Sequence, residues 1–232
     1  MNERHFDVLE VRAGLEAENG AFAERVRSRT DGEGCFLINL MASPGAGKTS
    51  AVCRILDALS GRFRIGVLEA DMDDDVDART VSERGAEAVQ LHTGTSCHMD
   101  AKMTLRGLEA FETLPDVVIL ENVGNLVCPA EFDVGADLRL MILSVPEGDD
   151  KPLKYPLMFT VSDWMLVNKI DAAPAFDFDM DRLVRNVRAL RPDMEIFPVS
   201  AKTGAGFPAF TEKLAETVSA ALARKRGKAG PA

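Results

Sequence analysis

An apolar run followed at once by a glycine-rich loop and an amphipathic helix is the feature that most constrains this fold. Residues 35–41 (CFLINLM) are almost continuously apolar, which is typical of a strand buried in a parallel sheet. The loop Ala42–Thr49 (ASPGAGKT) comes next, and residues 48–59 have the periodicity of a helix. A strand, a tight loop and a helix in this order predict the first unit of an open α/β sheet.

The same alternation of strands and helices continues along the chain. Further strands are predicted at residues 64–69, 86–91, 116–121, 138–145, 164–167 and 195–199, and helices at residues 8–28, 76–83, 99–111, 179–190 and 206–222. This pattern predicts an α/β fold of the P-loop NTPase type, with a mostly parallel sheet of about seven strands and helices on both faces. In such sheets, ligands bind at the carboxyl ends of the strands.

Composition narrows the classes of protein that fit. The 232 residues suit one α/β domain, and the 46% hydrophobic content provides a sizeable core. The net charge of −10 argues against nucleic acid as the principal partner. No apolar stretch has the length of a membrane span or the form of a signal peptide, so we expect a cytoplasmic protein without a membrane partner.

The loop Ala42–Thr49 matches the phosphate-binding pattern G-x-x-x-x-G-K-[ST], except that Ala42 replaces the first glycine. The backbone amides of such a loop close around phosphate oxygens, and the following helix N-terminus adds partial positive charge. We expect Lys48 to reach the β- and γ-phosphates as a catalytic residue, and the Thr49 hydroxyl to ligate Mg²⁺. The predicted phosphate site comprises Gly45, Ala46, Gly47, Lys48, Thr49 and Ser50.

The segment Asn168-Lys169-Ile170-Asp171 follows an apolar strand and indicates which base is bound. The Asp171 carboxylate can accept hydrogen bonds from both N1–H and N2–H₂ of guanine, whereas adenine would leave it unpaired. The Lys169 stem can lie along the base, and Asn168 can bridge the base and the phosphate loop. Backbone groups of the S-A-K segment can donate to guanine O6, so the predicted base site also includes Ser200, Ala201 and Lys202.

Two carboxylates at predicted strand ends are candidates for the magnesium and water side of this site. Asp71 ends one strand and Glu121 ends another. Carboxylates there can hold Mg²⁺ directly or through water, or orient the attacking water, so both are assigned as metal-binding and catalytic.

A separate group of thiol and imidazole side chains follows two other strand ends. Cys97 and His98 lie in one loop, and Cys128 lies in another that should face the same edge of the sheet. Two thiolates and an imidazole suit Ni²⁺ or Zn²⁺. The set is incomplete as a metal site by itself, and packing is a competing interpretation from spacing alone. Cys35 and Cys53 are interpreted as small core residues.

Longer motifs make the chain resemble a known family. S-P-G-A-G-K-T, T-G-x-x-C-H-M-D-A, E-N-V-G-N-L-V-C-P-A-E-F-D, S-V-x-E-G-D-D-K-P-L-K-Y-P, N-K-I-D and S-A-K-T-G occur in that order. Together they resemble the hydrogenase nickel-incorporation GTPases, the HypB family, over roughly residues 36–210. The division that follows is an N-terminal helix in residues 1–34, a GTPase (G) domain in residues 35–222 and a flexible tail in residues 223–232.

The resemblance implies a GTPase of slow turnover that binds GTP or GDP and helps to deliver nickel to [NiFe]-hydrogenase. It implies a homodimer that responds to nucleotide or metal, with Ni²⁺, or Zn²⁺ at the same site, held by Cys97, His98 and Cys128. The implied partners are a small zinc-containing nickel chaperone and the hydrogenase large subunit. Relatives that carry Cys- or His-rich nickel motifs near the N-terminus differ from this chain, where only His5 precedes Cys35, so we expect no such site here.

Two rival functions remain open. A GTPase of the same class could serve urease, although the E-N-V-G-N-L-V-C-P stretch favours hydrogenase. A nickel- or zinc-binding buffer protein without significant GTPase activity is an interpretation from another class, and the intact Lys48, Thr49 and Asp171 argue against it.

Overall fold

The computed structural model describes residues 3–71, 81–94 and 96–228. Seven strands form one sheet in the order β3-β2-β4-β1-β5-β6-β7, and every pairing between neighbours is parallel. The strands are β1 (Phe36–Ala42), β2 (Ile65–Asp71), β3 (Glu87–His92), β4 (Val117–Glu121), β5 (Leu138–Ser144), β6 (Trp164–Asn168) and β7 (Glu195–Pro198). The predicted parallel α/β fold is therefore confirmed, and the predicted strands match these to within two residues at each end.

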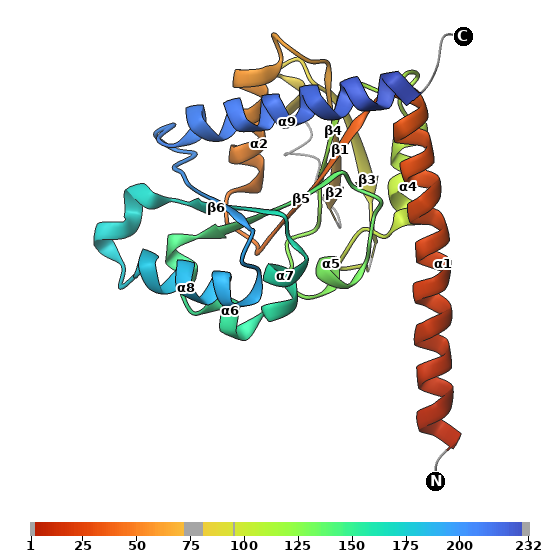
Figure 1. The fold of residues 1–232 in the computed structure, drawn as a ribbon, viewed down its shortest axis with the longest axis horizontal. Helices are drawn as coiled ribbons and strands as arrows, with labels where there is room; N and C mark the ends of the chain where they lie inside the picture. The colour runs from red at the N-terminus through yellow and green to blue at the C-terminus, as the bar shows by residue number, and fades with distance from the viewer. Residues whose placement is uncertain (1–2, 72–80, 95, 229–232) are drawn as a thin grey trace.

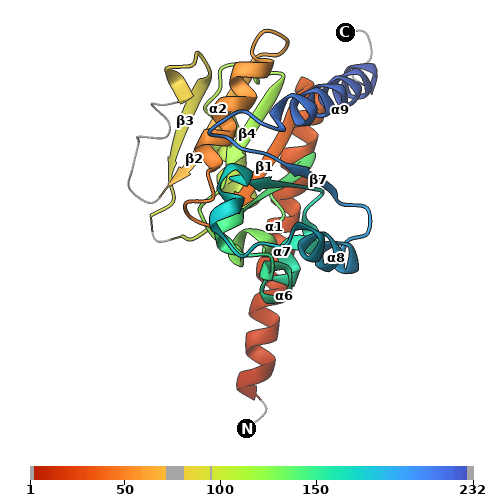
Figure 2. The ribbon, with the colours of Figure 1, turned by 90° about the vertical axis from the view of Figure 1, so that its left-hand side faces the viewer.

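Helices cover both faces of the sheet (Figures 1 and 2). They are α1 (Glu3–Glu33), α2 (Lys48–Leu59), α4 (Ala101–Glu109), α5 (Cys128–Glu131), α6 (Lys151–Lys154), α7 (Pro156–Val161), α8 (Met180–Leu190) and α9 (Phe207–Lys228), with 3₁₀ turns η1 (Val145–Glu147) and η2 (Ile170–Ala175). Side chains of α2 and α9 share one apolar core, while those of α1 and α4, and of α7 and α8, pack on the opposite face. Strand β1 contributes side chains to the cores on both faces because its side chains alternate in direction.

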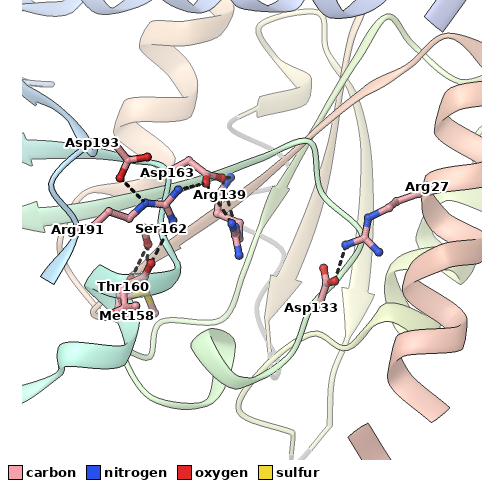
Figure 3. Close-up of polar contacts among 9 residues, drawn as sticks. All are labelled: Arg27, Asp133, Arg139, Met158, Thr160, Ser162, Asp163, Arg191 and Asp193. Atoms are coloured by element: carbon pink, nitrogen blue, oxygen red, sulfur yellow. Dashed lines mark hydrogen bonds and ion pairs between the residues drawn. The ribbon is translucent and has the colours of Figure 1, made fainter. Parts of the chain in front are cut away.

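Helix α1 lies against α4, and its N-terminal part extends beyond the rest of the protein (Figure 1). Asn19 fixes it to the loop after α5 and to the start of α4: its Nδ2 donates to Asp133 O at 2.8 Å, and its Oδ1 accepts from Ala101 N at 3.0 Å. Arg27 also pairs with the Asp133 carboxylate (Figure 3). The N-terminal helix is longer than the predicted span of residues 8–28, and these contacts attach its C-terminal half to the domain.

The C-terminal helix α9 continues past Leu222, where the predicted helix ends, to Lys228. The buried Lys225 explains this, because its Nζ donates to Cys35 O and to Asp137 Oδ2, both at 2.7 Å. The expected tail from residue 223 is thus helical as far as Lys228, and residues 229–232 lie outside the described chain.

A network of charged side chains joins the start of β5 to the loop before β6 (Figure 3). The Asp163 carboxylate accepts from Arg139 Nη2 at 3.1 Å and from Arg191 Nη2 at 2.9 Å, and Arg191 also pairs with Asp193 at 3.3 Å. These groups lie at the amino ends of the strands. They hold the sheet together at the edge opposite the loops described below.

Candidate functional site

The loop after β1 has the backbone geometry that its glycines allow. Gly45 has φ 72° and Gly47 has φ 97°, a left-handed conformation that side chains rarely adopt. Gly47 caps α2, and a Cβ added there would lie 2.5 Å from Asn168 Nδ2. Lys48 and Thr49 are consequently the first residues of α2, where a helix N-terminus can bind an anion.

The N-K-x-D segment lies against this loop. Asn168 is buried, and its Nδ2 donates to Ala46 O at 2.9 Å while its Oδ1 accepts from Ala201 N at 3.0 Å. Lys169 adopts φ 62°, and its Nζ donates to Gly45 O at 2.6 Å. The structure therefore brings the predicted phosphate and base segments together at the carboxyl ends of β1, β6 and β7.

Asp171 is exposed at the open side of this arrangement. Its Oδ1 accepts from Ser200 Oγ at 2.6 Å, which orients the carboxylate relative to the S-A-K loop. An exposed and oriented carboxylate is the geometry needed to accept two donors from the edge of a guanine ring.

The predicted magnesium side is only partly described. Thr49 Oγ1 donates to Glu121 Oε1 at 2.9 Å, and Glu121 is buried at the end of β4. Asp71 is the last residue of β2, but its side chain lies outside the described part of the chain. Glu69 is a buried carboxylate that we did not predict as a site residue. It pairs in register with Glu121 and brings a second carboxylate to this position.

The structure brings Cys97, His98 and Cys128 together, from the loop after β3 and the start of α5. The two Sγ atoms are 3.0 Å apart, Cys97 Sγ is 3.9 Å from His98 Nδ1, and one ligand atom from each residue fits within 4.8 Å of the others. Two sulfurs and a ring nitrogen at this spacing are a suitable donor set for Ni²⁺ or Zn²⁺.

Neighbouring residues hold the His98 ring in place and shift the pKa values of His98 and Cys128. The His98 ring stacks on Phe132 with centroids 4.0 Å apart. Burial lowers the pKa of His98, despite the opposing charges of Asp100 and Glu131, which favours the neutral imidazole that can ligate a metal. The neighbouring Cys97 thiol and partial burial raise the pKa of Cys128, so metal binding must displace its proton.

A buried asparagine connects this cluster to the nucleotide side. Asn122 Oδ1 accepts from Met99 N at 3.0 Å, and Asn122 Nδ2 donates to Asn39 Oδ1 on β1 at 3.1 Å. Asn122 also directly follows Glu121, so a single buried residue links the Cys97-His98 loop to the end of β4. Two residues later, Gly124 lies so close to the phosphate loop that an added Cβ would be 3.1 Å from Pro44 Cα.

Thiol reactivity tests the division between site and core cysteines. Burial raises the pKa of the fully buried Cys35 thiol to about 12, and burial also raises that of Cys53. Because the thiolate reacts and burial also excludes the reagent, we expect both to be inert at pH 8. The exposed Cys97 should be labelled in the folded, metal-free protein, and so should the half-buried Cys128, more slowly because its pKa is raised. Mass mapping after alkylation should find Cys35 and Cys53 labelled only in denaturant. Fast labelling of either one would contradict this assignment.

Comparison with known proteins identifies the family. The model of the CobW/HypB/UreG nucleotide-binding domain matches residues 36–198. Hydrogenase maturation factor HypB of Rhizobium leguminosarum bv. viciae is 40% identical over 222 residues, covering 95% of this chain and 74% of the relative. The chain belongs to the HypB family. The corresponding factor of Azotobacter vinelandii is 42% identical over 200 residues, which cover 86% of this chain and 66% of that relative.

Solved structures agree with this membership. The crystal structure of HypB from Helicobacter pylori in complex with nickel has a TM-score of 0.82 and 35% identity, and the match covers 87% of this chain and 95% of that one. HypB from Archaeoglobus fulgidus has a TM-score of 0.79 and 32% identity, with 87% and 99% covered. No helix in the described residues is both long and apolar enough to cross a membrane.

Proposed function

We propose that this HypB-family protein binds and hydrolyses GTP and delivers nickel during the maturation of [NiFe]-hydrogenase. The observation that carries the proposal is the link from Thr49 through Glu121 and Asn122 to the Cys97-His98 loop, which joins a nucleotide site to a metal-ligand cluster. The nickel complex of the H. pylori relative supports the cargo. As partners we propose a small zinc-containing nickel chaperone and the hydrogenase large subunit, both in the cytoplasm.

In this proposal, each residue of the nucleotide site has a distinct role. Lys48 would contact the β- and γ-phosphates, and Thr49 and Glu121, with Asp71, would hold Mg²⁺ directly or through water. Bound Mg²⁺ would neutralise charge that develops on the transferred phosphoryl group. Asp171 accepts the guanine N–H donors, and Lys169 and Asn168 hold the base segment against the phosphate loop.

Coupling requires that the nickel ligands have different geometry in the two nucleotide states. The loop at Gly124 closely approaches Pro44 in the phosphate loop, so a γ-phosphate that moves one would move the other. Asn122 would carry that displacement to Met99, the residue after His98. Hydrolysis would then reverse the change and reset the nickel site.

Phosphate release is the direct test of the enzymatic part. The protein with Mg²⁺ should release phosphate slowly from GTP and not measurably from ATP. A protein that binds nickel but releases no phosphate from GTP would instead be a metal buffer. Urease maturation is the second candidate function, because a relative from H. pylori, 34% identical over 221 residues, is named hydrogenase/urease maturation factor HypB.

We further propose a homodimer through the face formed by α5, α6 and α7, which lie together at one end of the sheet (Figure 1). Three large apolar side chains are exposed on or beside these helices: Leu153 at 68%, Val127 at 49% and Leu157 at 45%. Val127 immediately precedes Cys128, so this face adjoins the metal cluster. Three ligands from one chain leave coordination positions that a second copy can fill.

Charge placed on this face should prevent the association. We expect the double variant Leu153→Glu/Leu157→Glu to remain folded, because both side chains are exposed, but to be monomeric at concentrations where the wild type dimerises. Sedimentation with nickel and a GTP analogue measures this. Phe176→Glu is the matched control, since Phe176 is 45% exposed outside α5–α7. Equal dimerisation of the double variant and the wild type would exclude this face.

A further inference from the structure

Arg54 on α2 makes a two-point contact with the S-A-K loop that the sequence motifs do not predict. Its Nε donates to Ala201 O at 2.8 Å, and its Nη2 donates to Lys202 O at 2.9 Å. Both acceptors are backbone carbonyls. The contact therefore holds the backbone of the loop in place and does not depend on which side chains the loop carries. A planar group with parallel donors suits this task, whereas a lysine offers only a single point of attachment.

The peptide groups around Ala201 are held from two sides. On one side, Asn168 Oδ1 accepts from Ala201 N, and on the other side Arg54 donates to Ala201 O. The turn is closed by Gly204 N, which donates to Ser200 O at 2.8 Å. Gly204 has φ 85°, and a Cβ added there would lie 3.7 Å from Arg54 Nη1. The loop is thus fixed to the helix that follows the phosphate loop.

We propose that Arg54 is a positioning residue for base selection, which fixes the S-A-K loop so that a backbone N–H other than Ala201 N, which already donates to Asn168, faces O6 of a guanine nucleotide. This inference rests on the proposed function and adds a residue to the same site. Lys48 and Thr49 begin the helix that carries Arg54, so one rigid element sets the distance between the phosphate contacts and the O6 contact. A backbone donor discriminates between bases only when its position is fixed before the ligand arrives.

The proposal predicts an effect that depends on atom 6 of the base. In Arg54→Ala the loop loses both anchors from α2 but keeps its contact to Asn168. We expect the dissociation constant for GDP to rise about tenfold, the loss of about one well-placed hydrogen bond. For 6-thio-GDP, the same substitution should raise the dissociation constant by about threefold or less. Sulfur replaces O6 in this ligand and is a poor acceptor, while the N–H donors that Asp171 binds are unchanged. In hydrolysis, KM should rise while kcat is unchanged.

Calorimetric titration of the full chain with GDP, 6-thio-GDP and ADP provides the test. Arg54→Lys should recover part of the GDP affinity, because lysine can still donate to one carbonyl. Arg62→Ala is the matched control, since Arg62 follows α2 and pairs with Glu212 on α9 at 3.1 Å, away from this loop. Thermal unfolding of each variant checks that the proteins are folded.

The outcomes separate this inference from the function on which it rests. A selective loss of GDP affinity in Arg54→Ala, with partial recovery in Arg54→Lys, supports the positioning role. Equal weakening of GDP and 6-thio-GDP, or no weakening, overturns it and leaves a GTP-binding protein. Wild-type protein that binds ADP as tightly as GDP would overturn the proposed guanine specificity itself.

Discussion

Asp171→Asn should weaken GTP and GDP binding by about 10³-fold, because the exposed carboxylate is replaced by a group with one acceptor and one donor. The amide NH₂ would then face the N2 amino group of guanine, donor against donor. Xanthine carries an oxygen in place of that amino group, so the same variant should bind xanthosine diphosphate better than GDP. Titration with both nucleotides measures this reversal.

Asp177→Asn is the matched control for this prediction, since Asp177 is an exposed carboxylate just after the 3₁₀ turn η2 that contains Asp171. It should leave both affinities unchanged. In Asp171→Asn the hydrogen bond from Ser200 Oγ can persist to the amide oxygen of the new side chain, so the fold of the loop is not expected to change. If the Asp171 variant bound GDP as tightly as the wild type, the base would have to be read elsewhere.

Glu121→Gln should lower kcat for GTP hydrolysis by about two to three orders of magnitude while GDP binding without Mg²⁺ changes little. The substitution keeps the shape of a buried side chain that accepts from Thr49 but removes its charge. The concentration of Mg²⁺ required for half-maximal activity should rise as well. Steady-state phosphate release across a Mg²⁺ titration measures both quantities.

Glu147→Gln removes a comparable charge in the 3₁₀ turn η1 that follows β5, where Glu147 Oε2 accepts from Ser144 N at 2.7 Å. This control should lower thermal stability without changing the Mg²⁺ requirement. Equal effects of the two substitutions on activity would mean that Glu121 acts only through the stability of the fold.

The elements that the sequence predicted well are those with a long and simple pattern. Helix α2 begins and ends at the predicted residues, because the glycine loop fixes its start and its apolar spacing is regular. The short helices α5, α6 and α7 were missed, since each has four to six residues with proline in its first turn and too little length for periodicity. The predicted helix at residues 76–83 lies largely outside the described chain.

Site residues were also predicted where they lie in short local motifs and missed where their role depends on tertiary contacts. The N-K-x-D and Cys-His residues stand in short motifs next to strand ends, so parallel topology was enough to place them together. Arg54, Glu69 and Asn122 were not predicted, because their importance depends on partners distant in sequence. No periodicity within α2 indicates that one of its arginines reaches a loop that follows β7.

Nickel affinity that depends on the bound nucleotide is the central expectation for this protein. We would measure nickel binding by competition with a chelating dye, with GDP and with a non-hydrolysable GTP analogue, on the wild type, Cys97→Ala and the control Cys53→Ala. We predict affinities that differ at least about fivefold between the two states in the wild type and Cys53→Ala, and loss of the site in Cys97→Ala. Nickel affinity that is the same with either nucleotide and is unaffected by Cys97→Ala would contradict this coupling.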